Sequence, residues 1–430
     1  MLSYIAYPTS LTLRSANALQ TYTTLRELRA RRPDTLALIP RWGREPSRFA
    51  ELGVMHLPRP AIGKLSRLHR STLLYYMEHT AFAFMCAAVL AQRQRTSPIE
   101  AVYVRQVVCA AWWSAVIGPR LGIPVIYEAH DLEARNPSRA KEPWAQGLLY
   151  LMDRAALSCS AAVVSLTDDF RRYLAAIGWR EPNEVFVVPD AYDERLFAPQ
   201  NRLDCRAALG LPADAQIVAY AGMTFAHRWL DGLVAAVKRL AHARSGANAP
   251  PLHLILVGGR LAEAEALRQN GDLRIGGASS RDTSAALPIA PGAFVHFISP
   301  RPQAEVVCYL GAADVLAIPD TVTDITASPL KLFEYLALGQ PLVLPDLPAL
   351  REIVPPAAAC YFPRRDLDGL SNALDRALSL RADQAGMNAR RALAREHTYG
   401  RRAERILAVV EQVTMNKRGE ERRDEETRRR

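Results

Sequence analysis

Short apolar runs alternate with stretches of helical periodicity along most of the chain. Apolar runs that predict buried strands occur at 4–7, 35–39 and 101–104, and apolar positions at helical spacing occupy 15–30. The order strand, helix, strand is typical of a parallel sheet with helices on both faces. We therefore predict an α/β protein built on doubly wound sheets.

The alternation pauses once and then repeats. A polar, proline-containing stretch lies at about 195–212, after which the apolar runs resume. Because 430 residues also exceed one ordinary hydrophobic core, we predict two Rossmann-like domains, 1–195 and 196–397, that face each other across one hinge. The other expected elements are strands at 124–127, 162–165, 185–188, 217–222, 252–257, 294–297 and 315–318, helices at 110–121, 230–243, 261–269, 303–312, 366–381 and 383–396, and a loop at 279–292.

The end of the chain carries two further predictions. An amphipathic stretch at 398–414 predicts a helix that packs back on the first domain, whereas 415–430 is almost entirely charged or polar. Residues of that kind cannot bury a core, so we predict a disordered tail there.

Polar residues follow the predicted strand 124–127 directly. Glu128 and His130 lie just past its end, and open parallel sheets bind ligands outside the carboxyl ends of their strands. We therefore expect catalytic groups at this point. A satisfied structural histidine is the alternative interpretation of His130.

A short, well-delimited helix is predicted after Ser328. This serine suits the N-cap, Pro329 the first helical position and Gly339 the residue after the helix. Free amide groups at the N-terminus favour an anion, and Lys331 adds a charge one turn from Glu334. A cation for phosphate beside a carboxylate for a sugar diol suggests a nucleotide-sugar site. Ordinary helix capping with a solvated Lys–Glu pair is the alternative interpretation.

Positive charge is concentrated in the first part of the chain. Residues 1–120 hold sixteen Lys/Arg and six Asp/Glu, an excess equal to the net charge of +10 of the whole chain. Such an excess favours a polyanionic partner. No helix-turn-helix, zinc-finger or RNA-binding aromatic motif accompanies it, so we favour an anionic membrane surface over nucleic acid, with a solubilising face as the remaining alternative.

Three features bear on where the protein works. The long apolar helix predicted at 71–92 is interrupted by Glu78 and His79 and has too few uncharged residues to span a bilayer, which favours a buried or interfacial position. The six cysteines are scattered without a CxxC pair, which argues against a disulfide framework or a zinc site. The first seven residues lack the charged start of a signal peptide. We expect a cytoplasmic protein, peripheral on the inner face of the membrane.

The sequence resembles the family 4 glycosyltransferases, which are retaining enzymes of the GT-B architecture. The resemblance implies two Rossmann-like domains that face each other across a cleft, with the donor site in that cleft. Residues 328–335 match the Ser-Pro-Leu-Lys-Leu-Phe-Glu-Tyr-type segment of the second domain in that family. The family's strand-to-loop glycine falls at 220–222, its Ala-Asp-Val-hydrophobic-Pro strand at 313–319 and its interdomain segment at 188–197. The order and spacing of these segments carry the resemblance, which spans most of the chain.

The resemblance implies a donor site in the second domain. Glu334 would bind the ribose hydroxyls, and Arg228, at the position of the family's lysine, would bind the phosphates. A second phosphate-binding arginine of the family falls on Met223, and Lys331 would replace its charge. The first carboxylate of the family's glutamate pair falls on Thr326. The predicted donor-binding residues are Gly222, Arg228, Thr326, Ser328, Leu330, Lys331 and Glu334.

The first domain supplies the remaining candidates. The resemblance places His130 at the family's strand-end histidine, near the donor sugar. The family's Gly-Gly pair at the first helix, which lets the backbone approach the phosphates closely, falls on Ser15 and Ala16. Asn17 and Gln20 would supply side-chain contacts in place of that backbone approach. The predicted catalytic residues are His130, Arg228 and Lys331, and the acceptor-side candidates are Ser15, Asn17, Gln20 and Glu128.

These implications describe a metal-independent, retaining hexosyl-type glycosyltransferase. Its partners would be a nucleotide-sugar donor and a saccharide or lipid-linked acceptor of cell-surface polysaccharide or glycolipid synthesis. Asp366-Leu367-Asp368 spells the DxD of metal-dependent sugar transferases, but it lies at a helix start, where aspartate is favoured, so we expect neither a metal ion nor another cofactor. The departures at Met223 and Thr326 support an alternative, a nucleotide-sugar-binding or partner-binding subunit that has lost turnover.

Overall fold

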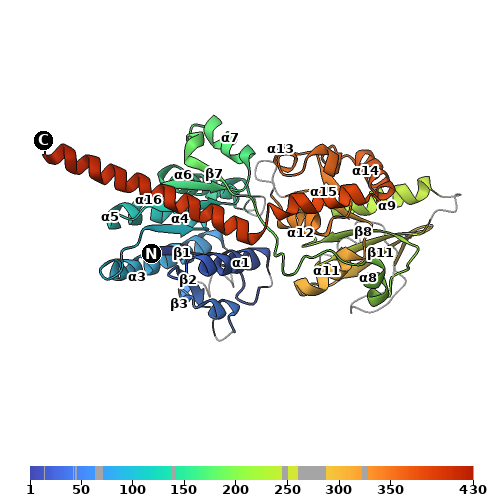
Figure 1. The fold of residues 1–430 in the computed structure, drawn as a ribbon, viewed down its shortest axis with the longest axis horizontal. Helices are drawn as coiled ribbons and strands as arrows, with labels where there is room; N and C mark the ends of the chain where they lie inside the picture. The colour runs from blue at the N-terminus through green and yellow to red at the C-terminus, as the bar shows by residue number, and fades with distance from the viewer. Residues whose placement is uncertain are drawn as a thin grey trace. The chain divides into compact units, whose positions relative to one another are not determined.

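The chain folds into two compact units. The computed structural model describes residues 1–13, 15–41, 43, 46–62, 71–136, 139, 142–244, 250–259, 287–321 and 328–429 (Figure 1). One unit comprises Met1–Pro189 and Tyr399–Arg430, and the other Asp190–Thr398. The chain thus passes from the first unit to the second a few residues before the predicted boundary at 195, and it returns at 398.

The first unit contains a parallel sheet with strand order β3-β2-β1-β4-β5-β6-β7. The order reverses between β1 and β4, and ligands of doubly wound sheets bind outside the carboxyl ends of the strands at that point. The strands are β1 (Leu2–Ile5), β2 (Leu36–Arg41), β3 (Met55–Pro58), β4 (Ala101–Val104), β5 (Val125–Ala129), β6 (Ala162–Ser165) and β7 (Val185–Val187).

Helices pack on this sheet and bury its apolar side chains. The long C-terminal helix α16 lies against α1 and contacts β4 and β6 (Figure 1). Its apolar residues join the core formed by the strands and α1. The main helices of the unit are α1 (Ala16–Arg31), α3 (Thr72–Gln94), α4 (Val107–Trp112), α5 (Gly118–Leu121), α6 (Gln146–Cys159), α7 (Asp168–Ala176) and α16 (Tyr399–Arg429), with a π-helical segment at Trp113–Ile117.

The second unit repeats this architecture with strand order β10-β11-β9-β8-β12-β13-β14. All described pairs are parallel except β10 with β11 at the edge. The order reverses at β8, which lies between β9 and β12. The strands are β8 (Gln216–Ala221), β9 (Leu252–Val257), β10 (Leu287–Ala290), β11 (Ala293–Ile298), β12 (Val315–Ala317), β13 (Leu342–Pro345) and β14 (Cys360–Phe362).

Side chains of β8 alternate between two cores, one on each face of the sheet. Ile217 and Ala219 lie in a core with α11 and α12, whereas Val218 and Tyr220 lie in a core with α9 and α14. A strand buried on both faces is mostly apolar, as the sequence of β8 is after its first residue, Gln216. The helices of the unit are α8 (Arg202–Leu209), α9 (Leu230–Ala243), α11 (Gln303–Gly311), α12 (Leu330–Leu338), α13 (Pro348–Arg351), α14 (Leu367–Ser379) and α15 (Gln384–Arg395).

The doubly wound α/β prediction is confirmed, but the structure corrects some details. Helix α16 continues to Arg429, where we predicted disorder from residue 415. The composition of that segment excludes a core, but Glu, Lys and Arg are strong helix formers and support an exposed helix. Strand β10 occupies part of the predicted loop at 279–292, and the short strands β3 and β14 were not predicted. The predicted helix 261–269 lies outside the described residues.

Candidate functional site

The switch point of the second sheet is marked by Gly222, which follows β8. Its φ of 138° lies in a region that L side chains rarely adopt, and its amide donates to the carbonyl of Val257 at 2.8 Å. A Cβ at this position would lie 2.5 Å from Nζ of Lys331. The residue must therefore be glycine for the lysine ammonium to lie beside the backbone.

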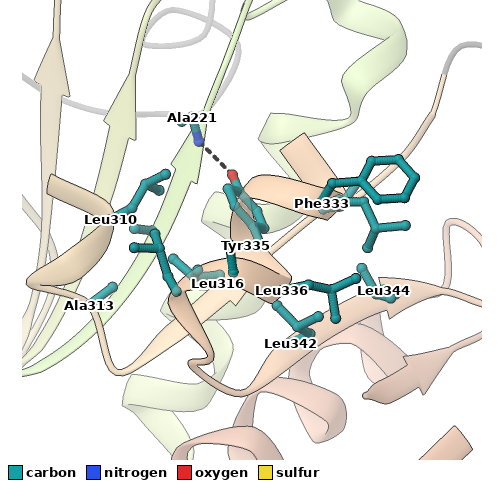
Figure 2. Packing of buried hydrophobic residues seen from close by; sticks show 14 of the residues in the cluster. Ala221, Leu310, Ala313, Leu316, Phe333, Tyr335, Leu336, Leu342 and Leu344 are labelled. Atoms are coloured by element: carbon teal, nitrogen blue, oxygen red, sulfur yellow. Dashed lines mark hydrogen bonds between the residues drawn. The ribbon is translucent and has the colours of Figure 1, made fainter. Parts of the chain in front are cut away.

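Helix α12 is fixed to the same strand end by a tyrosine. The hydroxyl of Tyr335 accepts a hydrogen bond from the amide of Ala221 at 2.8 Å, within a cluster of buried leucines (Figure 2). This bond satisfies a backbone donor where the ladder ends. At the other end of the helix, Gly339 adopts φ 89°, as expected for a C-terminal glycine, and its carbonyl accepts from Arg390 at 2.8 Å.

The N-terminus of α12 differs from the prediction in one respect. Pro329 is the N-cap, and no side chain caps the helix, so Ser328 does not have the capping role that we expected. The helix begins at Leu330, one residue later than expected. The hydroxyl of Ser328 is buried and has no hydrogen-bond partner among the described residues. A buried donor of this kind, beside the free amides of a helix N-terminus, suits an anionic ligand.

Lys331 projects from the first turn of α12 to the end of β8. Its Nζ lies 3.8 Å from the centre of the Tyr220 ring, a cation–π distance. Burial holds the pKa of this lysine well below its ordinary value, and the positive charge of Arg228 lowers it further. The carboxyl group of Glu334 opposes this shift of the pKa, and a bound anion would oppose it further.

Arg228 ends the short 3-10 helix Ala226–Arg228 that precedes α9. Its Nε is buried without a hydrogen-bond partner in the described part of the chain, and so is Nε2 of the neighbouring His227. Burial lowers the pKa of His227, and Arg228 adds to that effect. Arg228, Lys331 and Ser328 therefore bring unused donors and positive charge to one edge of the sheet.

Glu334 lies one turn after Lys331 and is also buried. Its Oε1 accepts a hydrogen bond from Nε2 of Gln303 at 3.1 Å. Burial raises the pKa of the carboxyl group to about 7, Lys331 opposes this shift and Asp190 reinforces it. The group is therefore poised between its neutral and ionised forms near neutral pH. Gln303 belongs to the surroundings of this carboxylate, and we had not predicted it.

A second unpredicted group follows β12. The carboxylate of Asp320 is fully buried and accepts from Nε of Arg364 at 2.7 Å and Nε of Arg365 at 2.8 Å. Asp320, Arg228 and Arg365 all influence the pKa of His227, which places the three charges around one histidine. An aspartate directly after a buried strand was the available sequence signal. The predicted donor residue Thr326 lies outside the described residues.

The strand-end residues of the first unit form a different kind of site. Glu128 is fully buried, and its Oε1 lies 3.0 Å from Nε of Arg105 and 2.7 Å from Nη2 of Arg402. Nε2 of His130 lies 2.7 Å from the same oxygen, and Tyr103 donates to Oε2. The positive neighbours Arg105 and Arg402 hold the pKa of Glu128 well below its ordinary value despite its burial.

The acceptor-side candidates are mostly engaged by the protein itself. Ser15 caps α1 by accepting from the amide of Ala18 at 3.2 Å, and Asn17 accepts from the amide of Thr9 at 3.3 Å. Gln20 is buried and accepts from Arg105 at 2.5 Å. Because Gln20 and Glu128 face the interior, the structure corrects our expectation that they contact an acceptor. His130 keeps 28% of its side chain exposed.

Some polar residues around this site were not among our predicted site residues. Asp131 follows His130, and burial raises the pKa of its carboxyl group to about 6. Glu78 of α3 accepts from the hydroxyl of Tyr7, which follows β1, and pairs with Arg59 at 2.5 Å. These residues also lie past the carboxyl ends of parallel strands or face them.

The described part of the chain shows no cluster of metal-binding side chains. No group of three His, Cys, Asp or Glu side chains there could hold a metal ion, and all six cysteines are free. Of the DxD sequence, Asp366 caps α14 by accepting from the amide of Asp368, and Asp368 pairs with Arg239.

Two family models match the chain, one in each unit. The model described as "Glycosyl transferase 4-like domain" matches residues 18–191, and the model described as "Glycosyl transferases group 1" matches residues 215–379. The chain belongs to the family 4 glycosyltransferases.

Curated relatives of this family 4 member agree with that assignment. The chain is 31% identical over 212 residues to a D-inositol 3-phosphate glycosyltransferase of Stackebrandtia nassauensis. This alignment covers 49% of the chain and 44% of the relative. A protein of the same description from Mycobacterium leprae is 26% identical over 216 residues, with 48% and 45% covered. The chain therefore matches less than half the length of these relatives.

Solved structures share the fold over nearly the whole chain. An Anabaena protein, HepE, in complex with UDP and glucose has a TM-score of 0.66 and 14% identity, with 96% of this chain and 99% of that chain covered. The sucrose-phosphate synthase of Thermosynechococcus elongatus has a TM-score of 0.62 and 17% identity, with 98% of each chain covered. These likenesses confirm the GT-B fold of the family 4 member.

The contact between Gly222 and Lys331 generates a prediction for folding stability. The substitution Gly222→Ala should lower the free energy of unfolding by about 1–3 kcal/mol, because the new Cβ meets Nζ of Lys331 and φ is unfavourable. In a Lys331→Ala background the steric part disappears, so the same glycine substitution should cost at least about 0.5 kcal/mol less. Urea denaturation of the four proteins measures this coupling. Equal costs in both backgrounds would contradict the contact.

Proposed function

We propose that this family 4 glycosyltransferase transfers a glycosyl group from a nucleotide-sugar to a saccharide or lipid-linked acceptor, with retention of configuration and without a metal ion. One observation carries the proposal. Buried donors without partners among the described residues, on Ser328 and Arg228, lie at the strand edge that also holds Lys331 and the carboxylate of Glu334. A nucleoside diphosphate offers the complementary groups, two phosphates for the donors and a ribose diol for the carboxylate.

The chemistry follows from where charge develops. The bond between the anomeric carbon and the phosphate oxygen breaks, and the diphosphate leaves with an added negative charge. Arg228 and the first amides of α12 supply positive charge to that group, and the ammonium group of Lys331 adds to it because the bound diphosphate raises the lowered pKa of this lysine. This charge lowers the barrier without a metal. The acceptor oxygen attacks the anomeric carbon from the face that the diphosphate leaves. Its proton passes to a phosphate oxygen, so the products are a glycoside and a nucleoside diphosphate.

The family's pattern is incomplete in this chain, which keeps a second function open. Met223 occupies the position of a phosphate-binding arginine, and Ser15 and Ala16 replace two glycines. A subunit that binds a nucleotide-sugar without transferring it would tolerate these changes. Hydrolysis of the donor in the absence of an acceptor separates the two functions, since a transferase leaks some hydrolysis and a binding subunit shows none.

Nucleotide affinity tests the placement of the donor site. UDP, GDP and ADP should be compared by thermal shift, and the one that stabilises most should be titrated by calorimetry. Arg228→Met and Lys331→Met should each weaken its binding about tenfold to a hundredfold, because each removes a charged contact to phosphate. Arg239→Met, on the exposed face of α9, is the matched control and should leave the affinity unchanged. Unchanged affinity in both site variants would show that the site is misplaced.

Glu334 should make nucleotide binding depend on pH. Its pKa of about 7 means that the carboxyl group is mostly neutral at pH 6 and mostly ionised at pH 8, where it accepts hydrogen bonds from ribose hydroxyls more strongly. The affinity ratio of wild type to Glu334→Gln should therefore be near one at pH 6 and rise to about tenfold at pH 8. The ratio cancels the titration of the nucleotide's own phosphates. A ratio that stays constant over this range would argue against a ribose-binding carboxylate.

We further propose that the first unit meets an anionic membrane through α3. This is the one helix among the described residues that is long and apolar enough to cross a membrane by length and composition, a test that core helices also pass. This finding differs from our prediction that the helix has too few uncharged residues to span a bilayer. One face is buried and tied to the unit by Glu78, whereas Leu73, Met77 and Phe84 are each more than 40% exposed. An exposed apolar stripe in the basic part of the chain suits an anionic bilayer.

Vesicle sedimentation checks this membrane proposal. The wild type should sediment with vesicles that contain phosphatidylglycerol at low salt and much less with pure phosphatidylcholine. Substituting serine for Leu73, Met77 and Phe84 together should weaken binding about a hundredfold, because each exposed side chain contributes about 1 kcal/mol on burial. Leu203→Ser, at an exposed leucine of α8, is the control. Wild-type protein that stays in the supernatant with both lipids would contradict the proposal.

A further inference from the structure

A buried charge cluster around Glu128 joins β5, β4 and α16 of the first unit. Glu128 is the second-to-last residue of β5. Arg105 directly follows β4, and Arg402 belongs to α16. Both guanidinium groups lie within 3.0 Å of its Oε1, and the hydroxyl of Tyr103 donates to Oε2. A fully buried carboxylate requires such partners, because an unpaired charge in the interior is strongly destabilising.

Each arginine of the cluster is fixed by further hydrogen bonds. Arg105 donates through Nη1 to Thr21 and through Nη2 to Gln20, both at 2.5 Å. Arg402 donates through Nη1 to the carbonyls of Val188 and Pro189 at 2.7 and 2.6 Å. Neither guanidinium is free to turn away, so the position of the Glu128 carboxylate is determined by α1, α16 and the end of β7 together.

The ring of His130 meets this carboxylate through one nitrogen. Its Nε2 lies 2.7 Å from Oε1 of Glu128 and 3.0 Å from Nη2 of Arg105. The guanidinium of Arg105 can only donate, so its contact favours a lone pair on Nε2, but that lone pair would face the closer, ionised carboxylate oxygen at repulsive range. The shorter contact with an ionised oxygen therefore fixes the proton on Nε2. The other ring nitrogen, Nδ1, then carries the lone pair.

We propose that Glu128, oriented by Arg105 and Arg402, is a positioning residue that holds His130 with its proton on Nε2 and leaves Nδ1 to accept a hydrogen bond from a substrate hydroxyl. The assignment of a substrate to His130 rests on the proposed function. Helix α16 thereby becomes part of the site through Arg402, although this residue lies more than 270 positions after His130 in the sequence and faces the interior. Arrangements in which a carboxylate orients a histidine are a known means of fixing its tautomer.

The first test is a double-mutant cycle on turnover in the full-length protein. Glu128→Gln should lower the kcat for donor hydrolysis at least about tenfold in the wild-type background and less than about twofold in a His130→Ala background, because the glutamate acts through the histidine. The affinity for the nucleotide should not change. Independent, multiplicative effects of the two substitutions would overturn the proposal, since they would mean that Glu128 acts by another route.

Neighbouring arginines of α16 provide a matched pair for the same assay. Arg402→Met should lower kcat with little change in donor KM. Arg402→Lys should recover only part of the loss, because lysine keeps the positive charge but lacks the planar, forked donors of the guanidinium group. Arg401→Met, at an exposed position one residue earlier, should behave as wild type. Equal effects of Arg401→Met and Arg402→Met would overturn the role of Arg402.

A spectroscopic test is independent of turnover. In protein labelled with ¹⁵N-histidine, NMR should show His130, assigned with His130→Gln, as a single tautomer protonated on Nε2. Glu128→Met should give a mixture of tautomers, because its side chain cannot accept the hydrogen bond. A wild-type ring protonated on Nδ1, or a mixture already present, would overturn the proposal. If no donor is turned over, the proposed function fails while this measurement still decides the inference. The NMR measurement also decides the inference in the case that Arg402→Met does not fold.

Discussion

Parallel pairing of the strands is the constraint from which both candidate sites follow. When strands run in one direction, their carboxyl ends meet at one edge, and the residues that come next in the sequence gather there although they lie far apart along the chain. In the second unit this places Gly222 and Asp320 near the start of α12. In the first unit it places Tyr7, Arg105 and His130 at one edge. The reversal of strand order then separates the helices and leaves that edge accessible.

The two edges handle buried charge in opposite ways. In the first unit, Glu128 is satisfied by partners that the protein supplies from β4, the residue after it and α16. In the second unit, Lys331 is buried beside Arg228, its pKa falls because of that burial, and the donors on Arg228 and Ser328 lack partners within the described residues. The first arrangement stabilises one geometry, and the second suits an anion, as the proposed function requires.

The sequence was sufficient for the features that depend on local patterns. Periodicity identified β4, β6 and α9 to the residue, and the Ser-Pro-Leu-Lys segment located α12 and the glycine at its end. The edge strand β3 was not predicted because its sequence, Met-His-Leu-Pro, contains a histidine and ends in a proline and so lacks the continuous apolar run of β4. Our prediction that Ser328 caps the helix was wrong, because Pro329 itself occupies the N-cap. Only the backbone geometry reveals that the helix begins one residue later than the sequence suggests.

What the sequence could not provide was the pairing of distant charges. Glu128 and Arg402 are separated by most of the chain, and nothing local to either predicts that they meet. Read from its strand-end position alone, Glu128 appeared suited to a ligand, but a carboxylate that is fully buried between two guanidinium groups has no access to one. The same burial is what makes it useful, because a charge in a medium of low polarity orients a neighbouring dipole far more firmly than one in water. The contribution of Glu128 to a site must therefore pass through His130, the one member of the cluster that retains both a contact with the carboxylate and an exposed surface.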